Sequence, residues 1–169
     1  MTDEVLDDKA FRAVMARFAT GVTVMTTLDD TGEPTGMTAN AVASVSLDPL
    51  LVLVCVGRDT DMSERVTAGG RFALSFLPVG AKETSTHFSD PTRSRGWAAF
   101  SEVAVTTART GCPIIASAIG WVDCTVADIH PGGDHLIVVG SVVAAGIDGH
   151  EDALGYYRHG YVRISAPDA

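Results

Sequence analysis

The amino-acid sequence predicts a mainly β fold, an antiparallel β-barrel with a few short helices. About seven short segments are β-branched, apolar or alternating, and turn residues such as Gly, Pro and Asp separate them. Helical patterns are short and lie only at the N-terminus and in the connections, which argues against alternating β-α-β units. This number of strands does not require a closed sheet, so a β-sandwich is the structural alternative.

Length and composition indicate a single domain of 169 residues, with its core over about residues 11–161. A charged fraction of 20% and a hydrophobic fraction of 46% are typical of a soluble globular protein. No apolar run approaches the ~20 residues of a membrane helix. The acidic start Thr2-Asp3-Glu4 is unlike a signal peptide. We therefore expect a cytoplasmic protein without membrane contact.

The formal net charge of −9 argues against nucleic-acid binding, which needs Lys and Arg to neutralise phosphates. The only lysines are Lys9 and Lys82, so a phosphate on any ligand must meet a local Arg or backbone N–H groups. Cys55, Cys112 and Cys124 show no metal-ligand spacing, and we expect no metal site. Their odd number suits a reducing compartment.

Four apolar residues at helical spacing predict an amphipathic helix that ends at Thr20-Gly21. They are Phe11, Val14, Met15 and Phe18. The β-branched stretch 22–28 predicts the first strand, and the polar residues 29–32 predict a turn after it.

Residues 37–47 and 50–56 predict the second and third strands. Asp48-Pro49 lies between them and predicts a bend, because proline cannot donate to a sheet ladder.

The middle of the chain mixes short helices with strands. Thr60 or Asp61 predicts the cap of a helix that ends at Gly69-Gly70. Arg93 and Arg95 are the only clustered positive charges, in a polar stretch that we expect to be a mobile loop. The expected elements are a helix over 59–66, a strand over 72–76, a helix over 81–88, the loop over 89–96 and an edge strand over 100–105.

The last third of the chain predicts two longer strands. Residues 114–119 are apolar but too short to assign to a strand or a helical turn. Residues 121–129 and 136–145 are β-branched or alternating and predict strands, with a turn over 131–134 between them.

Several common catalytic signatures are absent. The sequence has no G-x-G-x-x-G cradle for a dinucleotide and no P-loop for a phosphate. It also lacks the G-x-S-x-G motif that positions a nucleophilic serine. Any chemistry must therefore come from a different kind of site.

The stretch from Gly36 to Pro49 is the most informative one, because small and hydroxylated residues dominate it. A strand with few large side chains leaves room for a flat ligand, and its backbone groups can bond the ligand's edge. Asn40 is unfavourable inside a strand. Together with the hydroxyls of Thr38, Ser44 and Ser46, it offers donors and acceptors to such a ligand. The alternative is an ordinary core strand with local side-chain to backbone bonds.

A second informative stretch is Gly133-Asp134-His135. Two glycines before an aspartate already suffice for a turn. The histidine that follows is either a functional group held at the rim of the sheet or an ordinary surface residue.

These two stretches together resemble the flavin reductase family, and the resemblance spans roughly Phe11 to Tyr161. It implies an FMN-binding split-barrel fold, which is an open antiparallel barrel. It further implies hydride transfer from NADH or NADPH to FMN or FAD. The reduced flavin would then leave for a partner monooxygenase, and the protein would form a homodimer with its active site near the subunit contact.

The resemblance also assigns roles to individual residues. His135 would lie beside the nicotinamide, next to Asp134, and Tyr156-Tyr157-Arg158 would bind the nicotinamide dinucleotide. The flavin contacts would be Pro34, Thr35, Gly36, Met37, Thr38, Ala39, Asn40, Ala41, Cys55, Val56, Gly57, Asp61, Met62, His87 and Phe88.

Three of these positions depart from the family pattern. Ala41 stands where many relatives carry Ser, Asp61 where Ser or a basic residue is frequent, and His87 where Arg is common. Asp61 would repel a phosphate, and it is also explained as a helix N-cap. Phe88 is also explained as a core aromatic, and the two tyrosines as packing residues. The scarcity of positive charge predicts that flavin binds modestly, as a substrate.

Two rival functions remain on the same fold. One is a flavoenzyme similar to the pyridoxamine phosphate oxidases, which need more basic phosphate contacts than this chain offers. The other is a flavin or haem carrier or sensor without enzymatic activity.

Overall fold

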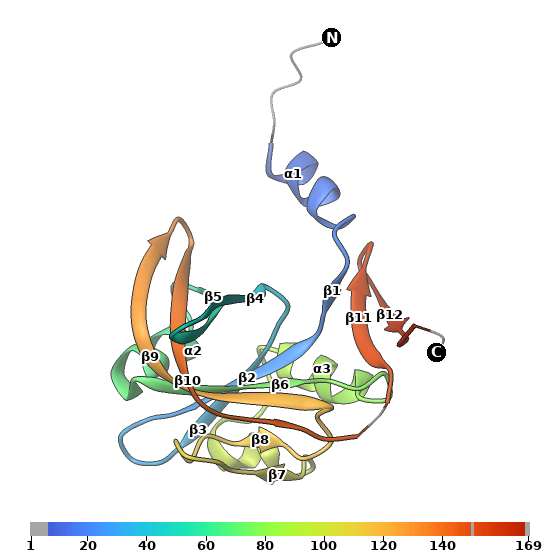
Figure 1. Cartoon of the computed structure of the whole chain (residues 1–169). Coiled ribbons are helices and arrows are strands. Elements are labelled where there is room, and N and C mark those ends of the chain that lie inside the picture. The colour runs from blue at the N-terminus through green and yellow to red at the C-terminus, as the bar shows by residue number, and fades with distance from the viewer. Residues whose placement is uncertain (1–6, 150, 168–169) are drawn as a thin grey trace.

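The computed structural model describes residues 7–149 and 151–167, so the segment Thr2-Asp3-Glu4 lies outside the described residues. One antiparallel seven-stranded sheet dominates the molecule (Figure 1), in the order β3-β2-β6-β9-β10-β5-β4. Its strands are β2 (Thr23–Leu28), β3 (Pro34–Ala39), β4 (Val42–Leu47), β5 (Leu50–Gly57), β6 (Arg71–Phe76), β9 (Gly120–Gly132) and β10 (His135–Ile147).

The sheet curls until its two edges meet. Its edge strands β3 and β4 are separated in the chain by Asn40 and Ala41 alone. The backbone N–H of Cys55 donates to the carbonyl oxygen of Ala41 over 3.0 Å, which holds this crossing against β5. No ladder joins β3 to β4 in the described sheet, so the barrel is split at this point. The predicted mainly β, split-barrel fold is confirmed, and the sandwich alternative is wrong because the seven main strands form one curled sheet.

The strand predicted over 37–47 is in fact two strands. Asn40 and Ala41 leave the ladder, because the chain crosses here from one edge of the sheet to the other. The following bend at Asp48-Pro49 is confirmed, and it joins β4 to β5 as a hairpin. The turn predicted over 131–134 is shorter than expected. The strands β9 and β10 pair up to Gly132 and His135, so only two residues form the turn.

Helix α2 (Asp61–Gly69) covers the main core, and its sequence signals are confirmed. Thr60 is the N-cap and forms a capping box with Ser63. Gly70 ends the helix in the left-handed region with φ of 60°. Buried residues of this core come from the helix and six strands, and they are Met62, Val66, Met25, Ala39, Val54, Val56, Phe72, Leu74, Cys124 and Val138.

A second core lies around Phe88 of helix α3 (Lys82–Ser89) and Phe100 of the 3-10 helix η1 (Gly96–Phe100). Their rings are 5.0 Å apart. The edge strand predicted over 100–105 is therefore wrong, because Phe100 is buried in a turn against Phe88. Only β7 (Val105–Thr106) pairs there, with β8 (Ile114–Ile115).

A small sheet of β1 (Thr20–Gly21), β11 (Ala153–Tyr157) and β12 (Gly160–Ile164) flanks this second core. The sequence predicts no strand beyond residue 145, so β11 and β12 are not expected from it. The hairpin turn is made by Arg158 and His159, with φ of 51° and 64°. Because neither is the Gly or Asn that usually marks such a turn, the hairpin carries no turn signal.

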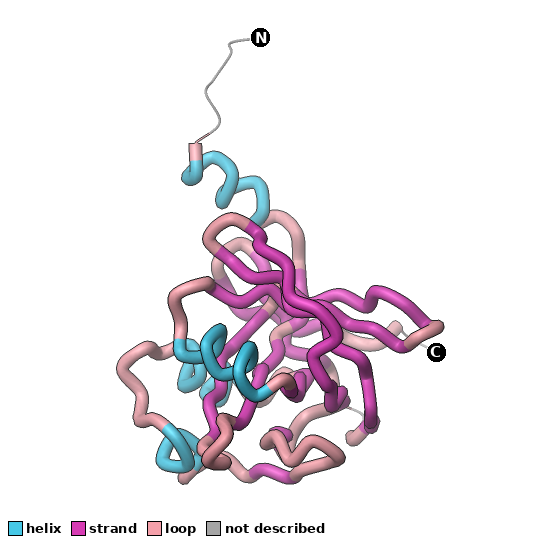
Figure 2. Tube along the Cα trace, turned by 90° about the vertical axis from the view of Figure 1, so that its left-hand side faces the viewer, coloured by secondary structure: helices cyan, strands magenta, loops and turns pink. Residues whose placement is uncertain are grey.

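The N-terminal helix α1 (Asp8–Met15) projects away from the sheet (Figures 1 and 2). Its amphipathic pattern is confirmed, yet no part of the described chain covers its apolar side. The exposed apolar residues are Phe11, Val14 and Met15, with Phe18 just beyond the helix. None of the helices in residues 7–149 and 151–167 has the length and apolar character to span a membrane.

Three buried polar side chains on neighbouring strands hold the segment 110–115 to the sheet. Asp123 of β9 is fully buried and accepts hydrogen bonds from both the backbone N–H and the hydroxyl of Thr110. The hydroxyl of Thr26 donates to the carbonyl oxygen of Pro113, and that of Ser75 accepts from the N–H of Ile115 over 3.0 Å. The carboxylate of Asp123 is thus stabilised by charge-assisted bonds within the protein.

Replacing Asp123 by Ala should lower the free energy of unfolding by about 1.5–3 kcal/mol, because Thr110 then loses two bonds to a charged acceptor. Chemical denaturation followed by circular dichroism measures this change. Asp128→Ala on the same strand is the control, since Asp128 is exposed. Equal stability of the two variants would contradict the assigned role of Asp123.

Candidate active site

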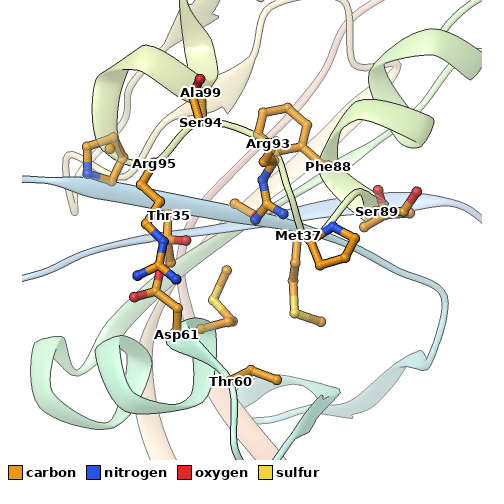
Figure 3. A pocket seen from close by; sticks show the side chains of 16 residues that line it. Thr35, Met37, Thr60, Asp61, Phe88, Ser89, Arg93, Ser94, Arg95 and Ala99 are labelled. Carbon is orange, nitrogen blue, oxygen red and sulfur yellow. The ribbon is translucent and has the colours of Figure 1, made fainter.

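A cavity of about 410 Å³ opens between β3, the N-terminus of α2 and the segment that follows α3 (Figure 3). The three parts meet here because the curled sheet brings β3 close to the start of α2. The cavity is lined by Pro34, Thr35, Gly36, Met37, Thr38, Thr60, Asp61, Met62, Phe88, Ser89, Pro91, Arg93, Ser94, Arg95, Gly96 and Ala99.

Strand β3 forms one wall, and Gly36 is its critical position. A methyl group at Gly36 would lie 2.8 Å from Cε1 of Phe88, too close for any side chain. The aromatic ring therefore packs directly on the backbone of β3. From the sequence, Phe88 is either a flavin contact or a core residue. In the structure, it lies both in the second core and on the cavity wall.

A charged pair lies at the start of α2. Nε of Arg65 donates to Asp61 over 2.9 Å, and Arg65 also bonds Asp29. Burial by itself raises the pKa of Asp61, but hydrogen bonds from Arg65 and Thr35 outweigh it and lower the pKa below its ordinary value. Asp61 is thus an anion at neutral pH. It is not the N-cap considered from the sequence, because Thr60 occupies that position.

The loop between α3 and η1 forms the opposite wall. The guanidinium of Arg93 donates to the carbonyl oxygens of Asp90 and Gly36, and it lies over the ring of Phe88 at 5.9 Å. Burial lowers the pKa of Arg93, but an Arg side chain stays charged at neutral pH. Arg93 thereby ties the loop to β3.

The sequence alone predicts only a mobile loop over residues 89–96. In the structure, six of these residues line the cavity: Ser89, Pro91, Arg93, Ser94, Arg95 and Gly96. The signal that could have found them was the one cluster of positive charge in an acidic chain.

A second, smaller cavity of about 220 Å³ adjoins the first, because Thr38 and Ser89 line both. The hydroxyl of Thr38 donates to the carbonyl oxygen of Ser85, and Ser85 shares a 2.9 Å hydrogen bond with the hydroxyl of Tyr161. The remaining lining residues are Val22, Asn40 and Tyr156. Two predicted site residues, Asn40 and Tyr156, therefore lie here and not in the first cavity.

His135 and Asp134 lie at the turn between β9 and β10, outside the lining of both cavities. Nδ1 of His135 donates to Asp134 over 2.8 Å, and this bond lowers the pKa of Asp134. His135 pairs with Gly57 at the end of β5. A methyl group at Gly57 would be 3.2 Å from Thr60, which lines the first cavity. Gly57 and Thr60 thus stand between the histidine and that cavity.

The other predicted site residues are dispersed. His87 points its Nε2 at the carbonyl oxygen of Ala99 over 2.7 Å, so it supports η1 from behind the cavity wall. Ala39 and Val56 are buried, and both belong to the main core. The remaining ones line neither cavity: Ala41, Ser44 and Ser46 at the β4 edge, Cys55 and Gly57 on β5, and Tyr157 and Arg158 at the tip of the C-terminal hairpin.

The fold and the cavity define a split-barrel protein whose site is formed by a strand edge, a helix start and an arginine-bearing loop. Residues 15–165 match the flavin reductase like domain. The chain therefore belongs to the flavin reductase family, as its sequence predicts.

Individual relatives agree with this assignment. The chain is 43% identical over 164 residues to a probable flavin reductase of Rhizobium meliloti, covering 95% of this chain and 50% of that protein. It thus spans half the length of that relative. It is 35% identical to the reductase subunit HsaB of a flavin-dependent monooxygenase of Mycobacterium tuberculosis, covering 81% of this chain and 71% of the subunit.

Among solved structures, the NADH:FAD oxidoreductase SgcE6 of Streptomyces globisporus, in complex with NAD and FAD fragments, superposes with a TM-score of 0.87. It is 38% identical, and the match covers 98% of this chain and 99% of that one.

Replacing Arg93 by Ala should release the loop from β3 while the fold stays intact. The loss of about 1 kcal/mol of net hydrogen bonding corresponds to roughly 5-fold faster amide exchange over residues 90–99. Hydrogen exchange with mass spectrometry measures this. Arg95→Ala is the matched control, because among the described residues no hydrogen bond is found for the Arg95 side chain. The same acceleration in both variants would argue against the anchoring role.

Proposed function

We propose that this protein is an NAD(P)H:flavin oxidoreductase that reduces free FMN or FAD. The carrying observation is the 410 Å³ cavity, whose wall is the Gly36 region of β3 and whose loop carries two arginines in a chain of net charge −9. The cavity runs along β3 from Pro34 to Thr38 and offers a wall for a flat ring, and the arginines suit a phosphate. The reaction is hydride transfer from the nicotinamide C4 to the flavin N5, for which the protein supplies binding and orientation.

The residues present fit a flavin in the first cavity. Thr35, Met37 and Thr38 flank Gly36 on β3, and Asp61 and Met62 face them from α2. We place the dinucleotide in the second cavity, because Tyr156 lines it and Thr38 connects it to the first one. Asn40, which is expected to contact the flavin, lines this second cavity. Tyr157 and Arg158 lie beyond it, at the tip of the C-terminal hairpin.

We also propose that reduced flavin passes to a partner monooxygenase and that the protein is a homodimer. The first point is supported by the relative named as a reductase subunit of a flavin-dependent monooxygenase. The second is supported by the uncovered apolar side of α1, since a second copy would bury it. A cytoplasmic location agrees with the three free cysteines.

The function is tested by mixing the protein with NADH or NADPH and following absorbance at the nicotinamide band. Oxidation should depend on added FMN or FAD, and dialysed protein should retain little flavin. Stoichiometric retained flavin would favour an oxidase similar to the pyridoxamine phosphate oxidases. Flavin binding without any nicotinamide oxidation would favour a carrier.

His135 is proposed to serve the nicotinamide, because it stands at the sheet rim and pairs with Gly57, which precedes the cavity-lining Thr60. A neutral imidazole donates one hydrogen bond and accepts another, which suits a carboxamide. His135→Ala should therefore raise the KM for the nicotinamide or slow hydride transfer by about 10-fold, the value of one lost hydrogen bond of roughly 1.4 kcal/mol. Flavin affinity should change little.

Stopped-flow reduction across a nicotinamide series and a fluorescence titration with flavin make this measurement. His130→Ala is the control, because His130 is an exposed histidine on the same hairpin. Loss of flavin binding with unchanged nicotinamide dependence would overturn the assignment, and no difference from the control would leave His135 as a surface residue.

A further inference from the structure

The first cavity carries positive charge in an acidic protein. Its ionisable lining residues are Arg93, Arg95 and Asp61, two cations against one anion. Outside the lining, Arg65 is paired with Asp29 and Asp61, and the carboxylates of Asp90 and Glu33 lie near Arg93 and Gly96. In a chain of formal net charge −9, the two arginines of the lining are the groups that an anionic ligand can contact inside the cavity.

The two arginines are not equivalent. Arg93 is half-buried and committed to the carbonyl oxygens of Gly36 and Asp90. Arg95 is exposed, and among the described residues no side-chain hydrogen bond is found for it. Figure 3 shows its guanidinium extending across the cavity toward Asp61. The charge of Arg95 is among the causes that lower the pKa of Asp61. Arg95 is thus the cation that remains free to meet a ligand.

We propose that Arg95 determines specificity by binding the phosphate group of the flavin, while Asp61 opposes it. The site would then favour FMN and FAD over riboflavin, which has the same ring and no phosphate. This inference rests on the proposed function. The flavin is the favoured source of the phosphate because Arg93 ties the same loop to Gly36, on the strand that forms the proposed ring site.

The opposite signs of the two side chains make the inference testable. Arg95→Gln should weaken FMN binding roughly 5- to 20-fold, as expected for a charge-assisted bond at a partly exposed site. Asp61→Asn should strengthen FMN binding, since an Asn oxygen still accepts from Arg65 while the repulsion is removed. Riboflavin affinity should stay within about 2-fold in both variants, because a neutral ligand feels neither change.

The measurement is the dissociation constant for riboflavin, FMN, FAD and NAD⁺ by fluorescence or calorimetry, each at low and high salt. Arg109→Gln is the charge-matched control, because Arg109 is exposed and lines neither cavity. The wild-type protein, this control and Asp61→Asn should all prefer FMN over riboflavin, by a margin that falls with salt, whereas Arg95→Gln should lose most of this preference.

Each other outcome has a defined meaning. Equal affinity of the wild-type protein for riboflavin and FMN would overturn the inference. An equal loss of riboflavin and FMN affinity in Arg95→Gln would also overturn it, because Arg95 would then be a structural residue. A loss of affinity confined to NAD⁺ would overturn it as well, because Arg95 would then serve the dinucleotide. If the wild-type protein binds no flavin at all, the proposed function fails, and with it the inference.

Discussion

The site depends on the close packing of the Phe88 ring against the backbone of Gly36. Because Gly36 has no side chain, helix α3 can approach β3 closely enough for the ring to touch the strand. The carbonyl oxygen of Gly36 also accepts a hydrogen bond from Arg93, and this bond holds the loop after α3 over the strand. His87 then supports η1 from behind through Ala99. One glycine thus allows three segments to form a single wall.

The electrostatics of the cavity follow from this arrangement. The chain is acidic as a whole, and its arginines are scattered along the sequence. The loop nevertheless brings Arg93 and Arg95 to face the N-terminus of α2, where Asp61 is already paired with Arg65. The two arginines therefore give the cavity lining a positive character that the net charge of the chain does not reveal.

Much of the fold was predictable because its signals are local. Alternation and β-branching predicted most strands, the cap of α2 was expected at Thr60 or Asp61, and Gly70 ends that helix in the left-handed region. Where the prediction failed, the cause was non-local. The C-terminal hairpin lacks a glycine at its turn, and residues 96–100 form a turn because Phe100 packs on Phe88. The strand over 37–47 is interrupted because its two halves belong to opposite edges of one sheet.

The sequence by itself determined the family, the antiparallel class and the importance of the stretch from Pro34 to Thr38, because residue type and spacing carry that information. Only the tertiary structure decided which residues share a cavity. It placed Asn40 and Tyr156 in the second cavity, turned His87 away from the first, and brought Arg95 to Asp61. These are contacts between segments far apart in the chain, and they are set by how the sheet curls and how α3 packs on it.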